Sequence, residues 1–195
     1  MSHQTKSTSI IPVKDLVLTA LMAAVICVVS PWSLSLGPIP FSLSIFVIYL
    51  SVYILGWKRG TLATGIYLLI GLVGLPVFSG FTGGPQKLFG PTGGFLLGYL
   101  PMALFIGIFL EKLLSKRLTF LRRVLCILVT FLGTMILYFF GTIWYSIQAG
   151  VNFGAAFAAC VAPFVLIDLA KNILANLIGP AIRSRIFHDL PRTVD

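Results

Sequence analysis

The uncharged stretch VLCILVTFLGTMILYFFGTIWYSIQAGVNFGAAFAACVAPFVLI, Val124–Ile167, indicates the fold class of this chain. A membrane-spanning helix needs about 20 mostly apolar residues, so this stretch is long enough for two spans. Three further runs without charged residues are Leu16–Trp57, Gly60–Gln86 and Leu88–Leu110. None shows the alternating segments of about ten residues that are typical of membrane β-barrels. The runs therefore predict an all-α membrane protein.

The overall composition agrees with this class. The chain of 195 residues is 58% hydrophobic and only 10% charged, and its mean hydropathy is +1.03. Soluble globular domains carry about 25% charged residues, so the soluble class is excluded. The length suits a single domain, 1–195. Cys27, Cys126 and Cys160 form no close pair, which argues against a disulfide framework or a metal site.

The formal net charge of +9 comes from basic residues that flank the apolar runs. Twelve of the fourteen lie in the two tails and in alternate loops: Lys6, Lys14, Lys58, Arg59, Lys112, Lys116, Arg117, Arg122, Arg123, Arg183, Arg185 and Arg192. This distribution is the positive-inside pattern of a multi-pass membrane protein. It favours contact with the lipid bilayer over binding to nucleic acid.

Glycines and prolines divide the chain into six predicted transmembrane helices with both termini cytoplasmic. Their expected ranges are 14–29, 41–56, 60–75, 93–110, 124–148 and 163–186. The first could instead be the apolar core of a signal peptide, but no small-x-small cleavage site precedes Trp32, which favours a retained helix.

The segment PFVLIDLAKNILANLIG contains two charges that lie inside a predicted span rather than at its cytoplasmic end, Asp168 and Lys171. Charged residues within the bilayer are costly, and they mark functional sites by default. Their i,i+3 spacing places both on one helical face, where Asn172 and Asn176 extend a polar stripe. The alternative is a structural salt bridge that only fixes helix packing.

Three outer segments rich in glycine, proline and aromatic residues are expected at the level of Asp168: Trp32–Phe41, Val77–Thr92 and Tyr145–Phe153. Irregular backbone at membrane depth is tolerated only where it is buried in protein or lines a cavity. We therefore expect a lid and rim over an outward-facing pocket. Aromatic residues there, such as Trp32, also serve as interfacial anchors.

The segment FTGGPQKLFGPTGG, Phe81–Gly94, superficially resembles a phosphate-binding loop. It lacks the GxxxxGK[ST] spacing of that loop and lies on the predicted outer side. Neither histidine, His3 or His188, is placed to serve a buried triad, and no HExxH or G-x-S-x-G motif is present. A binder of a small solute fits the residues better than an enzyme or a channel.

The run GLPVFSGFTGGPQKLFGPTGGFLLGYLPMA, residues 74–103, resembles the signature of the BioY family, the biotin-binding S components of energy-coupling-factor (ECF) vitamin transporters. The early ALMAAVICV, the LGP before Phe41 and the late pattern around Asp168 and Lys171 extend the resemblance over nearly the whole chain. The run PQKLF departs from the small apolar residues expected there, so the role of Gln86 and Lys87 stays open.

The resemblance implies a multi-pass protein of the bacterial cell membrane that binds biotin without a cofactor and catalyses no reaction itself. Its partners would be a transmembrane coupling subunit, docked at Ala20 and Ala24, and a pair of cytoplasmic ATPases. The rival functions are an S component for a different vitamin and a non-transport structural membrane protein. The implied biotin contacts are Asp168, Lys171, Asn172, Tyr145, Thr92, Gly90, Gly93, Phe41, Trp32 and Gln86.

Overall fold

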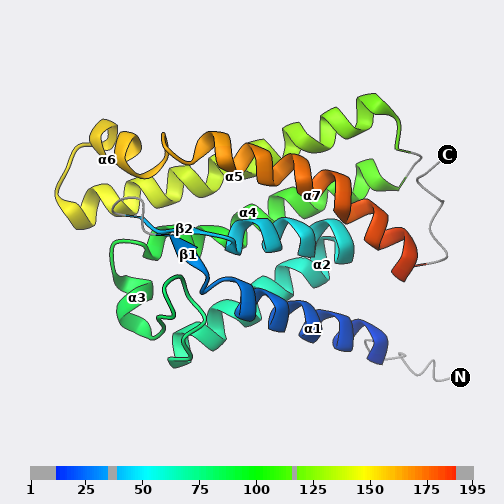
Figure 1. The fold of residues 1–195 in the computed structure, drawn as a ribbon, viewed down its shortest axis with the longest axis horizontal. Helices are drawn as coiled ribbons and strands as arrows, with labels where there is room; N and C mark the ends of the chain where they lie inside the picture. The colour runs from blue at the N-terminus through cyan, green and yellow to red at the C-terminus, as the bar shows by residue number, and fades with distance from the viewer. Residues whose placement is uncertain (1–11, 35–38, 116–117, 188–195) are drawn as a thin grey trace, which may run out of the picture.

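The chain forms an elongated bundle of long helices with a short two-stranded ribbon toward one end of it (Figure 1). The computed structural model describes residues 12–34, 39–115 and 118–187. The helices are α1 Val13–Val29, α2 Ser44–Val73, α3 Pro85–Phe89, α4 Gly93–Leu114, α5 Phe120–Ala149, α6 Phe153–Cys160 and α7 Val165–Ile186. The strands β1 Ser33–Leu34 and β2 Phe41–Ser42 pair antiparallel.

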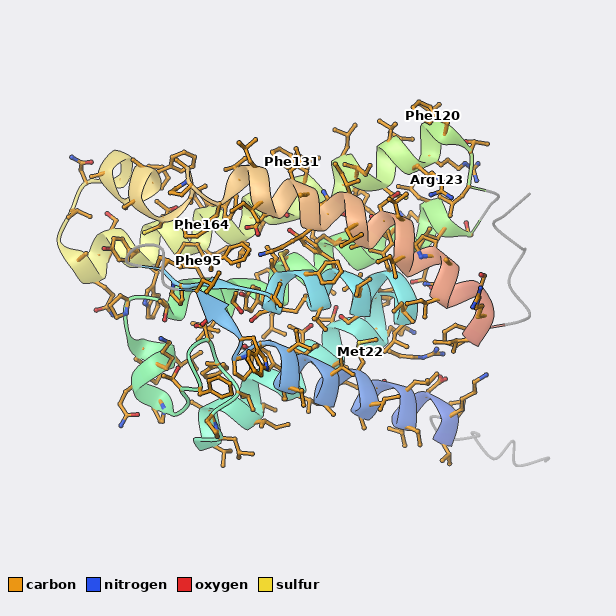
Figure 2. All side chains as sticks on the ribbon, in the orientation of Figure 1. Met22, Phe95, Phe120, Arg123, Phe131 and Phe164 are labelled. Atoms are coloured by element: carbon orange, nitrogen blue, oxygen red, sulfur yellow. The ribbon has the colours of Figure 1, made fainter. Side chains whose placement is uncertain are left out.

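Within these described ranges, four helices are long and apolar enough to cross a membrane: α2, α4, α5 and α7. Large apolar side chains cover their outer surfaces, among them Leu69 (62% exposed) and Leu132 (54% exposed). Phe120, 84% exposed, projects away from the bundle at the start of α5 (Figure 2). Such a surface suits lipid rather than water, so the predicted helical membrane class is confirmed.

The element α2 consists of two helices that meet at a reversal of the chain (Figure 1). Gly56 has φ 81° and ψ −177°, a conformation that favours glycine. A Cβ on Gly60 would lie 2.9 Å from the Cα of Val52. In one straight helix, residues eight apart are separated by about 12 Å. The predicted break between ranges 41–56 and 60–75 is therefore confirmed, and it arises from Gly56.

Several predicted boundaries differ from the structure. The last long helix begins at Val165 rather than Pro163, and the short helix α6 precedes it. Asn152 starts α6, because its side chain accepts a hydrogen bond from the Ala155 N–H at 2.8 Å. At the other end of the bundle, α5 begins at Phe120 rather than 124.

The glycine-rich segment Phe81–Gly94 folds as a turn, the short helix α3 and a second turn into α4. A Cβ on Gly93 would lie 1.7 Å from the Leu88 carbonyl oxygen, and one on Gly94 would lie 2.2 Å from the Trp144 Cβ. The Trp144 Nε1–H donates to the Gly90 carbonyl at 2.9 Å. The glycines therefore let this segment pack tightly against α5.

Hydrogen-bonded side chains connect α2 and α5 inside the bundle. The hydroxyl groups of Tyr49 and Thr134 share a hydrogen bond of 2.5 Å, and those of Tyr53 and Thr130 share one of 3.0 Å. Both tyrosines are fully buried. Because lipid offers no hydrogen-bond partner, such pairs satisfy polar groups within the membrane and align the helices.

Candidate functional site

A small cavity lies where the β2 strand meets the ends of the long helices. Its volume is about 60 Å³, and β2, α2, α4, α5, α6 and α7 all contribute to its walls. Phe95 of α4 and Phe164, which precedes α7, are two of the aromatic walls labelled in Figure 2. The remaining lining residues are Ile39, Pro40, Phe41, Ser42, Ile45, Tyr99, Leu137, Tyr138, Cys160, Asp168 and Lys171.

Asp168 and Lys171 form an ion pair in the wall of this cavity. The Lys171 Nζ atom lies 2.9 Å from Asp168 Oδ1, one helical turn away on α7. Each residue is only 8% exposed. The i,i+3 spacing that placed both charges on one face therefore also brings them into direct contact.

Groups from two other elements complete the environment of the pair. The Tyr138 hydroxyl of α5 donates to Asp168 Oδ2 at 2.6 Å. Lys171 Nζ donates to the Ser42 carbonyl oxygen of β2 at 2.8 Å and lies 3.9 Å from the centre of the Phe41 ring. Hydrogen bonds and a cation–π contact of this kind offset part of the cost of burying charge.

The opposite walls of the cavity are apolar and aromatic. The Phe41 and Phe164 rings are stacked with their centroids 6.3 Å apart. An apolar pocket with a few convergent polar groups is the usual form of a small-molecule site, but such sites measure about 300–1,000 Å³. The cavity is smaller, so it would have to widen to admit a ligand of that class.

Of the predicted contacts, the structure brings Asp168, Lys171 and Phe41 together at the cavity. Asn172 faces α5 instead, where its Nδ2 donates to the Ile127 carbonyl at 3.0 Å. Tyr145 is half-buried and packs against the apolar core. Neither lines this cavity, and their roles as ligand contacts stay predictions.

The outer-segment candidates other than Phe41 also lie outside the cavity lining. Trp32 is 63% exposed and makes an edge-to-face contact with Phe81, with ring centroids 5.7 Å apart. Gln86 is exposed on α3. Burial lowers the pKa of the neighbouring Lys87. The remaining candidates belong to the turn that packs on α5: Gly90, Thr92 and Gly93.

The sequence interpretation missed Tyr138, Tyr99 and Ser42. Tyrosine in membrane helices gathers at the interfaces, so Tyr138, near the middle of the predicted 124–148 span, carried a signal of burial. The Ser42 contact uses a backbone carbonyl, which no side-chain pattern reveals. Among the described residues, no group of three His, Cys, Asp or Glu side chains is placed to hold a metal ion.

Comparison with known proteins gives one family. The sequence profile of the BioY family matches residues 1–188. The chain is 39% identical over 168 residues to the biotin transporter BioY of Thermotoga maritima, and the alignment covers 85% of this chain and 94% of the relative. It is 33% identical over 174 residues to biotin transporter BioY2 of Lactococcus lactis, covering 89% and 92%.

A solved structure has the same fold. The crystal structure of the S-component for biotin from an ECF-type ABC transporter superimposes with a TM-score of 0.79. The two sequences are 28% identical, and the superposition covers 94% of this chain and 95% of the other. Together with the match over residues 1–188, these similarities show that the chain belongs to the BioY family.

Proposed function

We propose that this protein is the biotin-binding S component of an ECF-type transporter and that the cavity at Asp168 and Lys171 is its biotin site. The observation that carries the proposal is a buried carboxylate and ammonium 2.9 Å apart beneath stacked aromatic rings. Biotin has a polar ureido group, a carboxylate and an apolar ring between them. The two charges can serve its polar ends, and the aromatic walls can hold its ring.

The proposed topology has six membrane spans with both termini cytoplasmic, in the bacterial plasma membrane. The reversal at Gly56 supports it, because it divides α2 into two helices. The 17 residues of α1 would measure about 26 Å, close to the hydrocarbon thickness of a bilayer. Lys14 Nζ lies 3.5 Å from the Ile186 carbonyl oxygen, so α1 begins where α7 ends.

Uptake would require a transmembrane coupling subunit and a pair of cytoplasmic ATPases, with no reaction catalysed by this chain. The surface of α1 supports a docking role for the predicted small residues. Ala20 and Ala24 are exposed, whereas Thr19, Ala23 and Ile26 of the same helix are buried. Small residues four apart let another helix approach closely.

Replacing Ala20 or Ala24 with Trp is expected to abolish association with the coupling subunit while leaving biotin affinity unchanged. The indole ring would hold a partner helix away from α1, and the cavity is lined by other elements. Co-purification of the co-expressed subunits measures the association. Leu132→Trp, on the exposed face of α5, is the matched control. If Ala20→Trp and Ala24→Trp both assemble normally with the coupling subunit, this docking surface is contradicted.

The function itself is tested by measuring bound and titratable biotin. The purified protein in neutral detergent should carry biotin detectable by mass spectrometry, and the emptied protein should bind biotin but not thiamine or riboflavin. Tighter binding of another vitamin would identify an S component of different specificity. If the protein binds none of these vitamins, the Asp168–Lys171 ion pair would only fix helix packing in a structural protein.

A further inference from the structure

A second pocket lies at the end of the bundle opposite the cavity, where α1 begins, α2 reverses and α7 ends. Its volume is about 510 Å³. Four cationic side chains line it, Lys14, Lys58, Arg59 and Arg183, together with one acidic residue, Glu111. We call this the basic pocket.

The cations of the basic pocket outnumber the acids near them. Arg59 is paired with Asp15, 2.7 Å away. Arg59 and Lys14 also face the same Phe187 ring, at 5.4 Å and 5.5 Å from its centroid. Four positive and two negative side chains leave an excess of two positive charges. A bound anion would offset their mutual repulsion.

An apolar groove continues from the basic pocket along the outer surface of α2 and α4. Its volume is about 440 Å³, and Trp57 and Lys58 line both spaces. Beyond them the groove passes Leu62, Gly65 and Leu104. Leu62 is 50% exposed and Leu104 is 40% exposed, so the groove opens on the face of the helices that meets lipid.

We propose that the basic pocket and the groove together bind one anionic glycerophospholipid. Its phosphate would lie among Lys14, Lys58 and Arg183, and one acyl chain would lie along Leu62 and Leu104. The pocket is at the helix ends, the level at which headgroups occur, and basic pockets on the cytoplasmic side are suited to anionic headgroups. A free phosphate or an acidic protein segment would account for the charges but not for the adjoining groove.

Native mass spectrometry of the full chain in neutral detergent tests the headgroup part. Phosphatidylglycerol should bind more tightly than phosphatidylcholine of the same acyl chains. Lys58→Gln should lower the affinity for phosphatidylglycerol about fivefold, which corresponds to about 1 kcal/mol of binding free energy. Lys112→Gln removes the same charge from an exposed site outside the pocket and should have no such effect. Equal binding of the two lipids, or equal effects of the two variants, would overturn the proposal.

Gly65→Leu tests the acyl-chain part. A Cβ at Gly65 would meet Leu100 at 3.7 Å, an ordinary contact, so the variant should fold, and circular dichroism and thermal unfolding in detergent check this. The leucine side chain would fill the groove. It should lower the affinity for phosphatidylglycerol severalfold without changing the affinity for glycerol 3-phosphate. If Gly65→Leu leaves phosphatidylglycerol binding unchanged while Lys58→Gln still weakens it, the groove does not hold an acyl chain. The ligand of the basic pocket would then be a small anion or an acidic partner segment rather than a lipid.

Discussion

Asp168→Asn and Lys171→Ala are each expected to reduce biotin affinity by at least tenfold, or about 1.4 kcal/mol. Each change removes a charge from the cavity wall, where the two residues are only 8% exposed. Each also leaves the other charge buried without its partner at 2.9 Å. Isothermal titration calorimetry in detergent measures the affinity. If both variants bind biotin within twofold of the parent protein, the proposed site is wrong.

A double variant separates loss of binding from loss of folding. Breaking one side of a buried ion pair costs about 3–5 kcal/mol of stability, whereas replacing both charges with neutral residues of similar volume is often tolerated. Asp168→Asn combined with Lys171→Met should therefore unfold at a higher temperature than either single charge removal, yet still fail to bind biotin. If the double variant binds biotin, the two charges act only to fix helix packing and do not contact the ligand.

Gly93→Ala is expected to lower the free energy of unfolding by about 3 kcal/mol. The added methyl group would lie 1.7 Å from the Leu88 carbonyl oxygen, and Trp144 Nε1 is only 3.3 Å away. The contact is with backbone, which cannot rotate aside as a side chain can. Accommodating alanine would therefore require α3 to separate from the start of α4. Unfolding by sodium dodecyl sulfate, followed by circular dichroism, measures the loss.

Gly154→Ala is the matched control for this change. Gly154 also lies in the first turn of a helix, α6, but a Cβ there would contact only the Asn152 side chain, at 3.6 Å. The variant should unfold within about 0.5 kcal/mol of the parent, or be slightly more stable because alanine favours helix. Equal losses for the two alanine variants would show that the tight packing at Gly93 does not stabilise the protein.

The helical membrane class and the charged pair were predictable because both depend on short-range pattern. A run such as Val124–Ile167 needs no knowledge of its neighbours to favour a bilayer. Asp168 and Lys171 lie on one helix, so their spacing alone places them on one face. Helix ends were less predictable, as α6 shows, because single capping residues such as Asn152 set them.

Apart from Phe41, which the family resemblance implied, the groups that surround the pair were not predicted, because they come from distant parts of the chain. Tyr138 and Ser42 are 30 and 129 positions away from their partners on α7. The glycine-rich segment also has a packing role that its composition did not reveal. A Cβ on Gly93 would collide with the Leu88 carbonyl, and one on Gly94 would collide with Trp144.

Residue type and local spacing were thus sufficient for the membrane class, the break at Gly56 and the contact between Asp168 and Lys171. The enclosure of that pair, and the meeting of Lys14, Lys58 and Arg183 in one pocket, arise only when the helices pack. The physical reason is that periodicity acts within a helix, where neighbours are three or four residues apart. A cavity depends instead on which faces of separate helices meet. Single glycines such as Gly60 and Gly93 permit close contacts in that packing.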